Sequence, residues 1–373
     1  MRKWTVILGL CVTVTMHGFA SLPQSLKEPV ACLLSVGSEG KGNDKAQQAF
    51  KLVSAAHVTA IPDLLACMDG ANDYAMNWLR SAVESIAQRE ASLGKKLPIR
   101  QLESFVKQTQ HHPKARRFAY ELILKFSPEQ AKGMIESFLN DPSTELRRDA
   151  VQLLLQQADR SALNNRESAI STYRQALASA RDPDQIESIA KLLGDFGYKV
   201  DLPSIFGWVR RWKVIGPFDN TRNAGFSTRF APEDSVDWAG VYSGKNGSVR
   251  WVDLESRGDY GKVDFNVPFG SLKEVVGYAA AEFWSEKERP AEIRLGCKNG
   301  WKVWVNGQFL FGRDEYHTGA EIDQFSLPVT LSAGRNIILV KCTQNHQTED
   351  WTKEWEFQLR VTDKQGAPVL SAR

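Results

Sequence analysis

"KNGWKVWVNGQFLF" (residues 298–311) holds an Asn-Gly pair between two short apolar runs, and this pair decides the local fold. Asn306 and Gly307 readily adopt the positive φ angles of a two-residue type I′ turn, so the stretch predicts a β-hairpin. Trp304 then faces Phe309 across the turn, in the position of a cross-strand packing pair. We therefore expect Trp304 to be structural.

The other tryptophan of the stretch has two readings. Successive side chains of a strand point to opposite faces, so Trp301 and Trp304, three residues apart, lie on opposite sides of the sheet. The same register makes Val303 face Leu310. Trp301 stands where the strand begins, where it could either fill the core or meet a ligand.

Outside the hairpin, residues 207–365 read as short alternating strands separated by Gly, Pro, Asn and Asp. So many short strands without intervening helices favour two packed antiparallel sheets, a β-sandwich with jelly-roll connections. The expected strands cover residues 208–215, 249–252, 275–284, 291–297, 302–305, 309–311, 325–331, 336–342 and 355–361.

The motifs of this half carry a family resemblance: "WKVIGPFDN" (212–220), "KNGWKVWVNGQ" (298–308), "LPVTLSAGRNIILVKCTQ" (327–344) and "WEFQLRVTD" (355–363). They resemble the galactose-binding-like β-sandwich domains of secreted bacterial proteins, akin to the sugar-binding jelly rolls attached to glycoside hydrolases. The resemblance implies a carbohydrate-binding module. It is specific for the fold and weak for the ligand, since the motifs are the strands and turns of the sandwich.

Residues 25–202 show helical periodicity instead, in a recurring unit best seen in "DPSTELRRDAVQLLLQ" (141–156). Its proline turns the chain, Asp141 can cap the next helix, and Ala150 lets helices approach. The unit resembles the second helix of HEAT-like repeats, which implies an α-solenoid that presents a protein-interaction surface. A plain helical spacer is the alternative. We expect the neighbouring His111 and His112 to lie in a solvated turn.

The beginning of the chain predicts a signal peptide over residues 1–20, with a basic start, an apolar run and cleavage after Ala20. The protein is then secreted or periplasmic, with no membrane span after cleavage. Cys11 would be lost with the signal. The remaining cysteines allow two disulfides, Cys32–Cys67 and Cys297–Cys342, although unpaired buried thiols are equally consistent with the sequence.

Charge and motifs narrow the function. The chain has 373 residues and a formal net charge of +3, evenly spread, which does not suggest nucleic acid as a partner. We find no nucleophile elbow, HExxH helix, phosphate loop or dinucleotide-binding turn, so we expect a protein that is not an enzyme, without catalytic residues or cofactor. We expect no dedicated metal site, and only as a minor option a structural calcium ion held by carboxylates among Glu233, Asp234, Asp314 and Asp323.

Three polar loops of the sandwich are candidate binding sites, because sugar sites combine aromatic rings with polar side chains. The expected ligand-binding residues are Asp219, Asn220, Arg222, Trp301, His346, Asp350 and Trp351. A third loop offers Arg313, Asp314, Tyr316 and His317.

The sequence thus predicts an exported, non-catalytic binding protein that recognises carbohydrate or a cell-surface ligand. One alternative is a structural or assembly protein whose helices hold a protein partner while the sandwich binds no sugar. A hydrolase with an unrecognised site is the third possibility.

Overall fold

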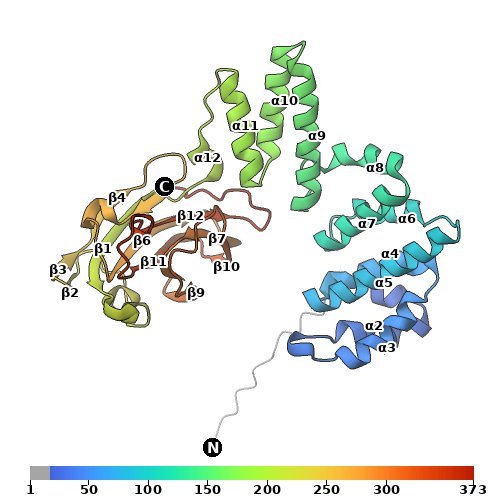
Figure 1. Ribbon diagram of the computed structural model, residues 1–373, viewed down its shortest axis with the longest axis horizontal. Helices are drawn as coiled ribbons and strands as arrows, with labels where there is room; N and C mark the ends of the chain where they lie inside the picture. The colour runs from blue at the N-terminus through green and yellow to red at the C-terminus, as the bar shows by residue number, and fades with distance from the viewer. Residues whose placement is uncertain (1–16) are drawn as a thin grey trace, which may run out of the picture. The chain divides into compact units, whose positions relative to one another are not determined.

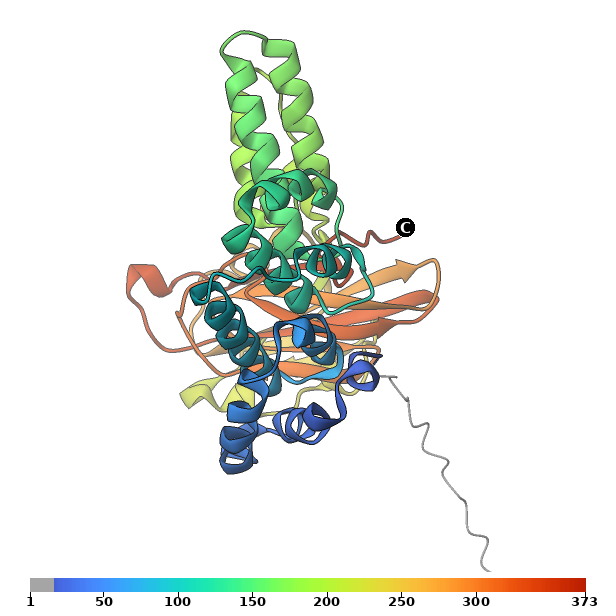
Figure 2. The same cartoon turned by 90° about the vertical axis from the view of Figure 1, so that its right-hand side faces the viewer.

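The computed structural model describes residues 17–373 and divides into two compact units, one ending at Ala180 and the other comprising Arg181–Arg373. Helices form the first unit, and antiparallel sheets dominate the second, as the colours from blue to red show in Figures 1 and 2. The order of α then β is as the sequence predicted. Residues 1–16 of the predicted signal, with Cys11, lie outside the described residues.

The first unit is built of ten α-helices within the described residues, joined by short turns. They are α1 (His17–Ser21), α2 (Gln24–Leu34), α3 (Asn43–Ser54), α4 (Ile61–Ala66), α5 (Asp73–Ser92), α6 (Ile99–Lys107), α7 (Pro113–Phe126), α8 (Pro128–Ile135), α9 (Thr144–Ala162) and α10 (Arg166–Ser179).

Alanine recurs at positions 82, 119, 150 and 190 of the helical half, and Ala190 is only half-buried. Ala82, Ala119 and Ala150 are buried on α5, α7 and α9. The cap of α9 differs from the expectation, because Ser143 accepts the hydrogen bond from the Leu146 amide.

Asp141 serves another purpose. Its carboxylate takes two hydrogen bonds from the buried Arg116 guanidinium, at 2.8 and 2.6 Å. A two-pronged bond of this kind fixes the orientation of both groups, so Asp141 ties the start of α9 to α7.

The histidine pair is only partly where we expected it. His112 caps α7 by accepting from the Lys114 amide. His111 is not solvated: its side chain is 12% exposed, its ring stacks on Phe105, and its Nδ1 lies 2.7 Å from the Asp69 carboxylate. The partner is 42 residues away in the chain, which is why local spacing did not reveal it.

The second unit begins with α11 (Pro183–Asp195) and α12 (Leu202–Phe206) and continues as twelve strands. They are β1 (Arg211–Asp219), β2 (Val241–Gly244), β3 (Gly247–Arg250), β4 (Val252–Glu255), β5 (Lys262–Asp264), β6 (Val275–Ser285), β7 (Arg289–Cys297), β8 (Gly300–Val305), β9 (Gln308–Arg313), β10 (Phe325–Leu331), β11 (Gly334–Gln344) and β12 (Glu356–Thr362). The sequence missed β2, β5, all but the first residue of β4, and the one-turn helix α13 (Asn266–Phe269).

All pairings between these strands are antiparallel. One sheet has the order β4-β1-β6-β11-β8-β9, a second has β10-β7-β12-β5, and β2 pairs with β3. A shared core joins the two larger sheets, with side chains such as Val340 from the first and Leu295 from the second. From β6 onward the chain passes repeatedly between these sheets.

The hairpin of residues 298–311 forms as predicted around Asn306 and Gly307, both at positive φ. Trp304 pairs with Phe309, but Val303 pairs with Phe311 rather than Leu310 because the register shifts by one residue there. Trp301 lies in the core between the sheets, and Trp304 lies in a second cluster on the outer face of the six-stranded sheet.

A buried lysine holds the segment after β1 onto that outer face. The Lys341 ammonium donates to the carbonyls of Phe226 and Thr228, at 3.1 and 2.7 Å, and to the Glu233 carboxylate at 2.8 Å. Burial lowers the pKa of Lys341 to about 8, although Glu233 acts against this shift. Residues 226–233 are therefore attached to the sheet by this ammonium group, and the Tyr278 hydroxyl of β6 also donates to Glu233, at 2.5 Å.

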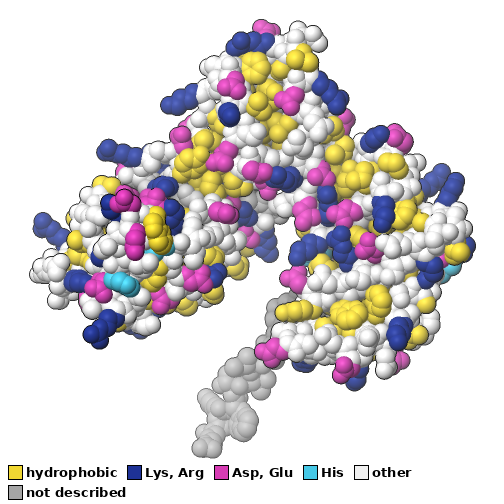
Figure 3. Space-filling model, viewed as in Figure 1, with side chains coloured by type: hydrophobic (Ala, Val, Ile, Leu, Met, Phe, Trp, Pro, Cys, Tyr) yellow, Lys and Arg dark blue, Asp and Glu magenta, His cyan; other side chains and the backbone are white. Residues whose placement is uncertain are grey.

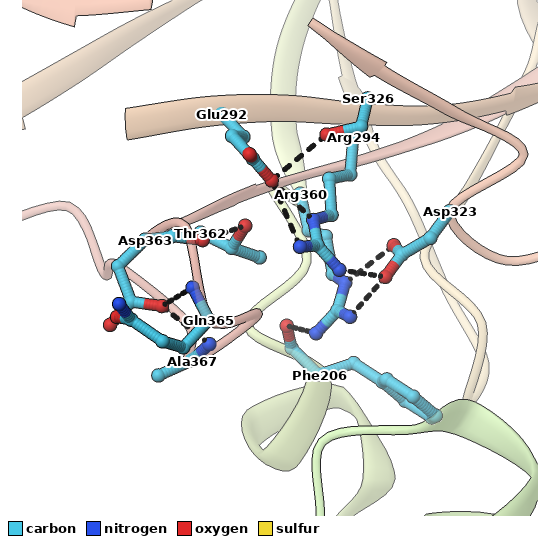
Figure 4. Close-up of polar contacts among 10 residues, drawn as sticks. All are labelled: Phe206, Glu292, Arg294, Asp323, Ser326, Arg360, Thr362, Asp363, Gln365 and Ala367. Atoms are coloured by element: carbon cyan, nitrogen blue, oxygen red, sulfur yellow. Dashed lines mark hydrogen bonds and ion pairs between the residues drawn. The ribbon is translucent and has the colours of Figure 1, made fainter. Parts of the chain in front are cut away.

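The outer face of the four-stranded sheet carries an ion-pair network, drawn in Figure 4. Arg360, 1% exposed, binds the Asp323 carboxylate through two nitrogens and donates to the Phe206 carbonyl at 3.2 Å. Arg294 bonds to Asp323 at 2.8 Å and to Glu292 at 2.9 Å. The network fixes α12 to the sandwich.

No single helix among residues 17–373 has both the length and the apolar composition to span a membrane. The pair of segments Asn43–Ser54 and Val58–Gly70, bent by 117°, meets those two criteria jointly.

Candidate functional site

Three loops meet at one end of the sandwich, which we call the rim. They are the three polar loops singled out in the sequence. The first loop (residues 219–225) follows β1, the second (343–355) follows β11, and the third (312–324) follows β9. Strand register explains the meeting: β1 ends opposite the start of β6, and so does β11, while β8 begins beside the end of β9.

Asn220 links the three loops through hydrogen bonds of its buried side chain. It is fully buried, and its Nδ2 donates to the Tyr316 hydroxyl at 3.2 Å and to the Gln344 carbonyl at 3.0 Å. Tyr316 also pairs with the Thr343 hydroxyl at 2.8 Å, and burial raises the Tyr316 pKa. Asn220 was predicted as a ligand-binding residue, but in this position it supports the rim instead of facing solvent.

Glu274, at the start of β6, adds a second set of ties. Its carbonyl accepts from the Asn220 amide at 2.9 Å and its carboxylate accepts from the Arg222 amide at 3.0 Å. Its own amide donates to the Asn345 carbonyl at 2.9 Å. No pattern in the sequence marked Glu274, because its contacts are with segments 29 or more residues away.

Trp351 supplies the exposed aromatic ring of the rim. It is 60% exposed and meets the His317 ring edge to face, with centroids 5.3 Å apart and an interplanar angle of 84°. His317 is held by its amide, which donates to the Lys298 carbonyl, and by its Nε2, 3.1 Å from the Asn345 side chain. His317, in the third loop, thus orients the indole of Trp351, in the second loop.

Charged groups at the rim are mostly paired. The Thr221 hydroxyl and then Lys245, 3.0 Å away, hold the pKa of Asp219 below its ordinary value. Lys353 lowers the pKa of the exposed Asp350 in the same way. Figure 3 shows charges of both signs interspersed over the visible face.

The remaining predicted residues are placed as follows. Arg222 and His346 are exposed in the first and second loops. Trp301 is 1% exposed and packs between Phe311 and Phe325, so its ring offers no surface to a ligand, and its assignment as a binding residue is corrected here.

Three of the four carboxylates considered for calcium are engaged elsewhere, and burial raises the pKa of the fourth, Asp314. Glu233 bonds to Lys341, Asp323 to two arginines, and Asp234 to Arg229. Within residues 17–373 no group of three or more His, Cys, Asp or Glu side chains is arranged to hold a metal ion.

The cysteines considered for disulfides are thiols in this structure. Cys297 Sγ lies 3.8 Å from Cys342 Sγ, one on each of the two packed sheets. Burial raises the pKa of both Cys67, to about 12, and Cys342. The two disulfides stay predictions.

A pocket on the outer face of the six-stranded sheet was not foreseen. Its volume is 440 Å³, and Lys213 and Glu282 on its walls are ion-paired with Asp253 and Arg335. The lining consists of Arg211, Trp212, Lys213, Trp238, Asp253, Ala280, Ala281, Glu282 and Arg373. Trp238 lies outside every predicted strand and loop, so nothing in the sequence pointed to it.

No protein-family model and no curated protein matches the chain. Among solved structures, a β-glucosidase from Kluyveromyces marxianus is 10% identical over 41% of this chain and 16% of its own, with a TM-score of 0.24. An anti-sigma factor domain-containing protein from Clostridium clariflavum is 12% identical over 44% and 45%, with a TM-score of 0.24. A family 35 carbohydrate binding module from an environmental isolate is 17% identical over 25% and 70%, with a TM-score of 0.17.

The chain therefore spans less than half the length of the first two of these structures. Scores this low carry no argument about function, and the proposals below rest on the geometry of the site.

Proposed function

We propose that this is a non-catalytic binding protein whose galactose-binding-like sandwich recognises carbohydrate at the rim, with Trp351 as its aromatic contact. The observation that carries the proposal is the exposed Trp351 indole, oriented by His317 on a platform of three hydrogen-bonded loops. A sugar ring has an apolar C–H face that packs on an indole, while its hydroxyls bond to polar groups around it. Arg222, His346 and Asp350 are among the exposed polar groups on these loops.

The platform is rigid enough to favour binding. Asn220 and Glu274 fix the first loop to the other two, so little loop ordering is left to occur when a ligand arrives. Ordering side chains and loops is a main cost of association, and a preformed site reduces it.

Two acids of the rim, Asp219 and Asp350, favour binding over hydrolysis, whereas Asp314 does not follow them. A general acid must hold its proton near neutral pH, which requires a raised pKa. The pKa values of Asp219 and Asp350 are instead lowered, by hydrogen bonds and a lysine beside each. Burial raises the pKa of Asp314, so this argument against a general acid applies to the first two residues alone.

The test is a glycan array probed with the full chain and with two variants. Trp351→Ala removes the exposed indole, and we expect the Kd of this variant for any bound glycan to rise on the order of tenfold. Phe309→Ala is the matched control, because Phe309 is 51% exposed and lies beside the hairpin turn, at the other end of β8 and β9 from the rim loops. Equal loss in both variants, or no glycan bound by the full chain, would refute carbohydrate recognition at the rim.

For the helical unit we propose a HEAT-like scaffold that holds a protein partner. Its support is the way α7 is joined to both neighbours: Glu121 bonds to Arg80 of α5 at 2.7 Å, and Arg117 bonds to Asp149 of α9.

Export to the periplasm or the medium is part of the same proposal. It is tested by fractionating cells and reading the N-terminal residue of the recovered protein, which should be Ser21; recovery from the cytoplasm with Met1 intact would refute it.

A further inference from the structure

A pocket of 430 Å³ lies in the helical unit, between the segment of residues 36–43 and the first turns of α5. It falls within the range of about 300–1,000 Å³ that small-molecule sites occupy. None of its lining residues is charged: they are Val36, Gly37, Gly40, Asn43, Tyr74, Asn77, Trp78 and Ser81.

The wall of the pocket is fixed by one asparagine. Asn72 caps α5 by accepting from the Ala75 amide at 2.9 Å, and its Nδ2 donates to the Val36 carbonyl at 2.7 Å. The segment then turns through positive φ angles at Gly40 and Gly42. The loop and the helix are therefore held together without a ligand.

The aromatic side of the pocket is oriented as well. Trp78 meets Phe50 of α3 edge to face, with ring centroids 5.6 Å apart, which sets the plane of the indole. Tyr74, one helical turn earlier, is 52% exposed. Residues four apart on a helix share a face, so both rings belong to the same stripe of α5.

The polar groups of the pocket are uncommitted. Within residues 17–373, the side chains of Asn43, Asn77 and Ser81 form no hydrogen bond. The ionised groups beside them on α5 are directed elsewhere, because Asp73 pairs with Lys114 at 2.8 Å and Arg80 with Glu121 at 2.7 Å.

From these features we propose a second carbohydrate site in the helical unit, for one or two rings of a neutral sugar. The indole of Trp78 packs on the C–H face of a ring, and the carboxamides of Asn43 and Asn77 bond to its hydroxyls. A carboxamide both donates and accepts, as a hydroxyl does, which suits this pairing. An anionic sugar would find no cation in the lining. The proposal is independent of the rim, which lies in the other unit.

An extended peptide is the competing occupant, and the surroundings of the pocket disfavour it. A peptide needs hydrogen-bonding groups that continue along a groove. Next to Ser81 the exposed surface of α5 carries instead the charged residues Arg80 and Glu84, and Arg80 is already paired with Glu121 and stacked on Phe118 at 4.4 Å.

The test uses the full chain carrying Trp351→Ala, which weakens binding at the rim, and Asn77→Ala in this background then separates the two sites. Calorimetric titration with neutral tetrasaccharides of glucose, xylose, mannose and N-acetylglucosamine should show one site per chain for at least one of them. Asn77→Ala in that background should raise the Kd roughly 3- to 10-fold, the effect of one lost hydrogen bond. Alanine is the best helix former, so this change leaves the helix intact.

Gln156→Ala, which removes an exposed carboxamide from α9, is the matched control and should leave the Kd unchanged. Trp78→Phe retains an aromatic contact with Phe50 and should weaken binding further. The proposal is overturned if no tetrasaccharide binds the Trp351→Ala chain, or if Asn77→Ala binds as tightly as its parent. Capture of an uncharged Gly-Ser decapeptide that Asn77→Ala abolishes, without sugar binding, would assign the pocket to peptide instead.

Discussion

Replacing Asp323 by Asn should destabilise the sandwich by about 3 kcal/mol, the lower end of the cost of removing one partner from a buried ion pair. The change is almost isosteric. Asp323 has φ 58°, a left-handed conformation that asparagine also tolerates, so the backbone is not strained by it. What is lost is the negative charge that faces Arg360 and Arg294. Arg360 is 1% exposed, so bulk solvent does not reach it to take the place of its counterion.

The same carboxylate predicts a pH dependence. Arg360 and Arg294 lower the pKa of Asp323, outweighing its burial, from the ordinary value of 3.8. A group whose folded pKa is lowered binds fewer protons in the folded state, so its stabilisation is complete above the unfolded pKa and is lost as pH falls through the folded one. The difference in stability between wild type and Asp323→Asn should therefore be full at pH 7 and shrink below about pH 4.

Urea unfolding followed by tryptophan fluorescence is the assay. Nine of the 11 tryptophans lie between residues 208 and 355, so the signal reports mainly on the sandwich. The reasoning is refuted if Asp323→Asn unfolds within 1 kcal/mol of wild type at pH 7, or if the difference is the same at pH 7 and pH 3. Ser326→Ala is the control, because it removes one hydrogen bond to Glu292, of 2.9 Å, and leaves Asp323 and both arginines in place.

Three further outcomes can be measured. Lys341→Met should speed amide hydrogen exchange in residues 226–233 and cost about 3 kcal/mol, because it leaves the Glu233 carboxylate buried without its cation; unchanged exchange would contradict the anchoring role. Gly225→Ala should weaken glycan binding without altering Trp351, since a Cβ there would lie 2.4 Å from the Asp219 carbonyl and 2.7 Å from Asn220 Oδ1; wild-type binding would show that the first loop does not support the site. If Cys297 and Cys342 bond in the exported protein, nonreduced peptide masses will show the link, and reduction will lower stability by about 2–4 kcal/mol; free thiols at both positions would end that prediction.

The sequence predicted what depends on neighbours in the chain. Asn306-Gly307 determined its hairpin because the turn and its flanking strands are contiguous. The separation of Trp301 and Trp304 onto opposite faces followed from strand periodicity. Periodicity could not say which face is the inner one, and so left Trp301 open as a ligand contact when it is in fact part of the core.

Contacts between distant segments were beyond the sequence. Each rim loop was identifiable by its polar and aromatic composition, but their meeting depends on the order of strands in the sheet. Asn220 and Tyr316, 96 residues apart, become partners only because β1 and β9 end at the same side of the sandwich. The prediction that His111 is solvated was wrong for the same reason, because its partner Asp69 lies 42 residues away in the chain.

The buried thiols allow the opening of each unit to be followed by chemical labelling. Burial raises the pKa of Cys67 to about 12, so at pH 7 its side chain is almost entirely in the unreactive thiol form. In the reduced protein, Cys67 and Cys342 should react with an alkylating reagent only when their surroundings open. Cys67 lies in the helical unit and Cys342 in the sandwich, so one labelling time course, read by peptide mass, would count the opening of each unit separately.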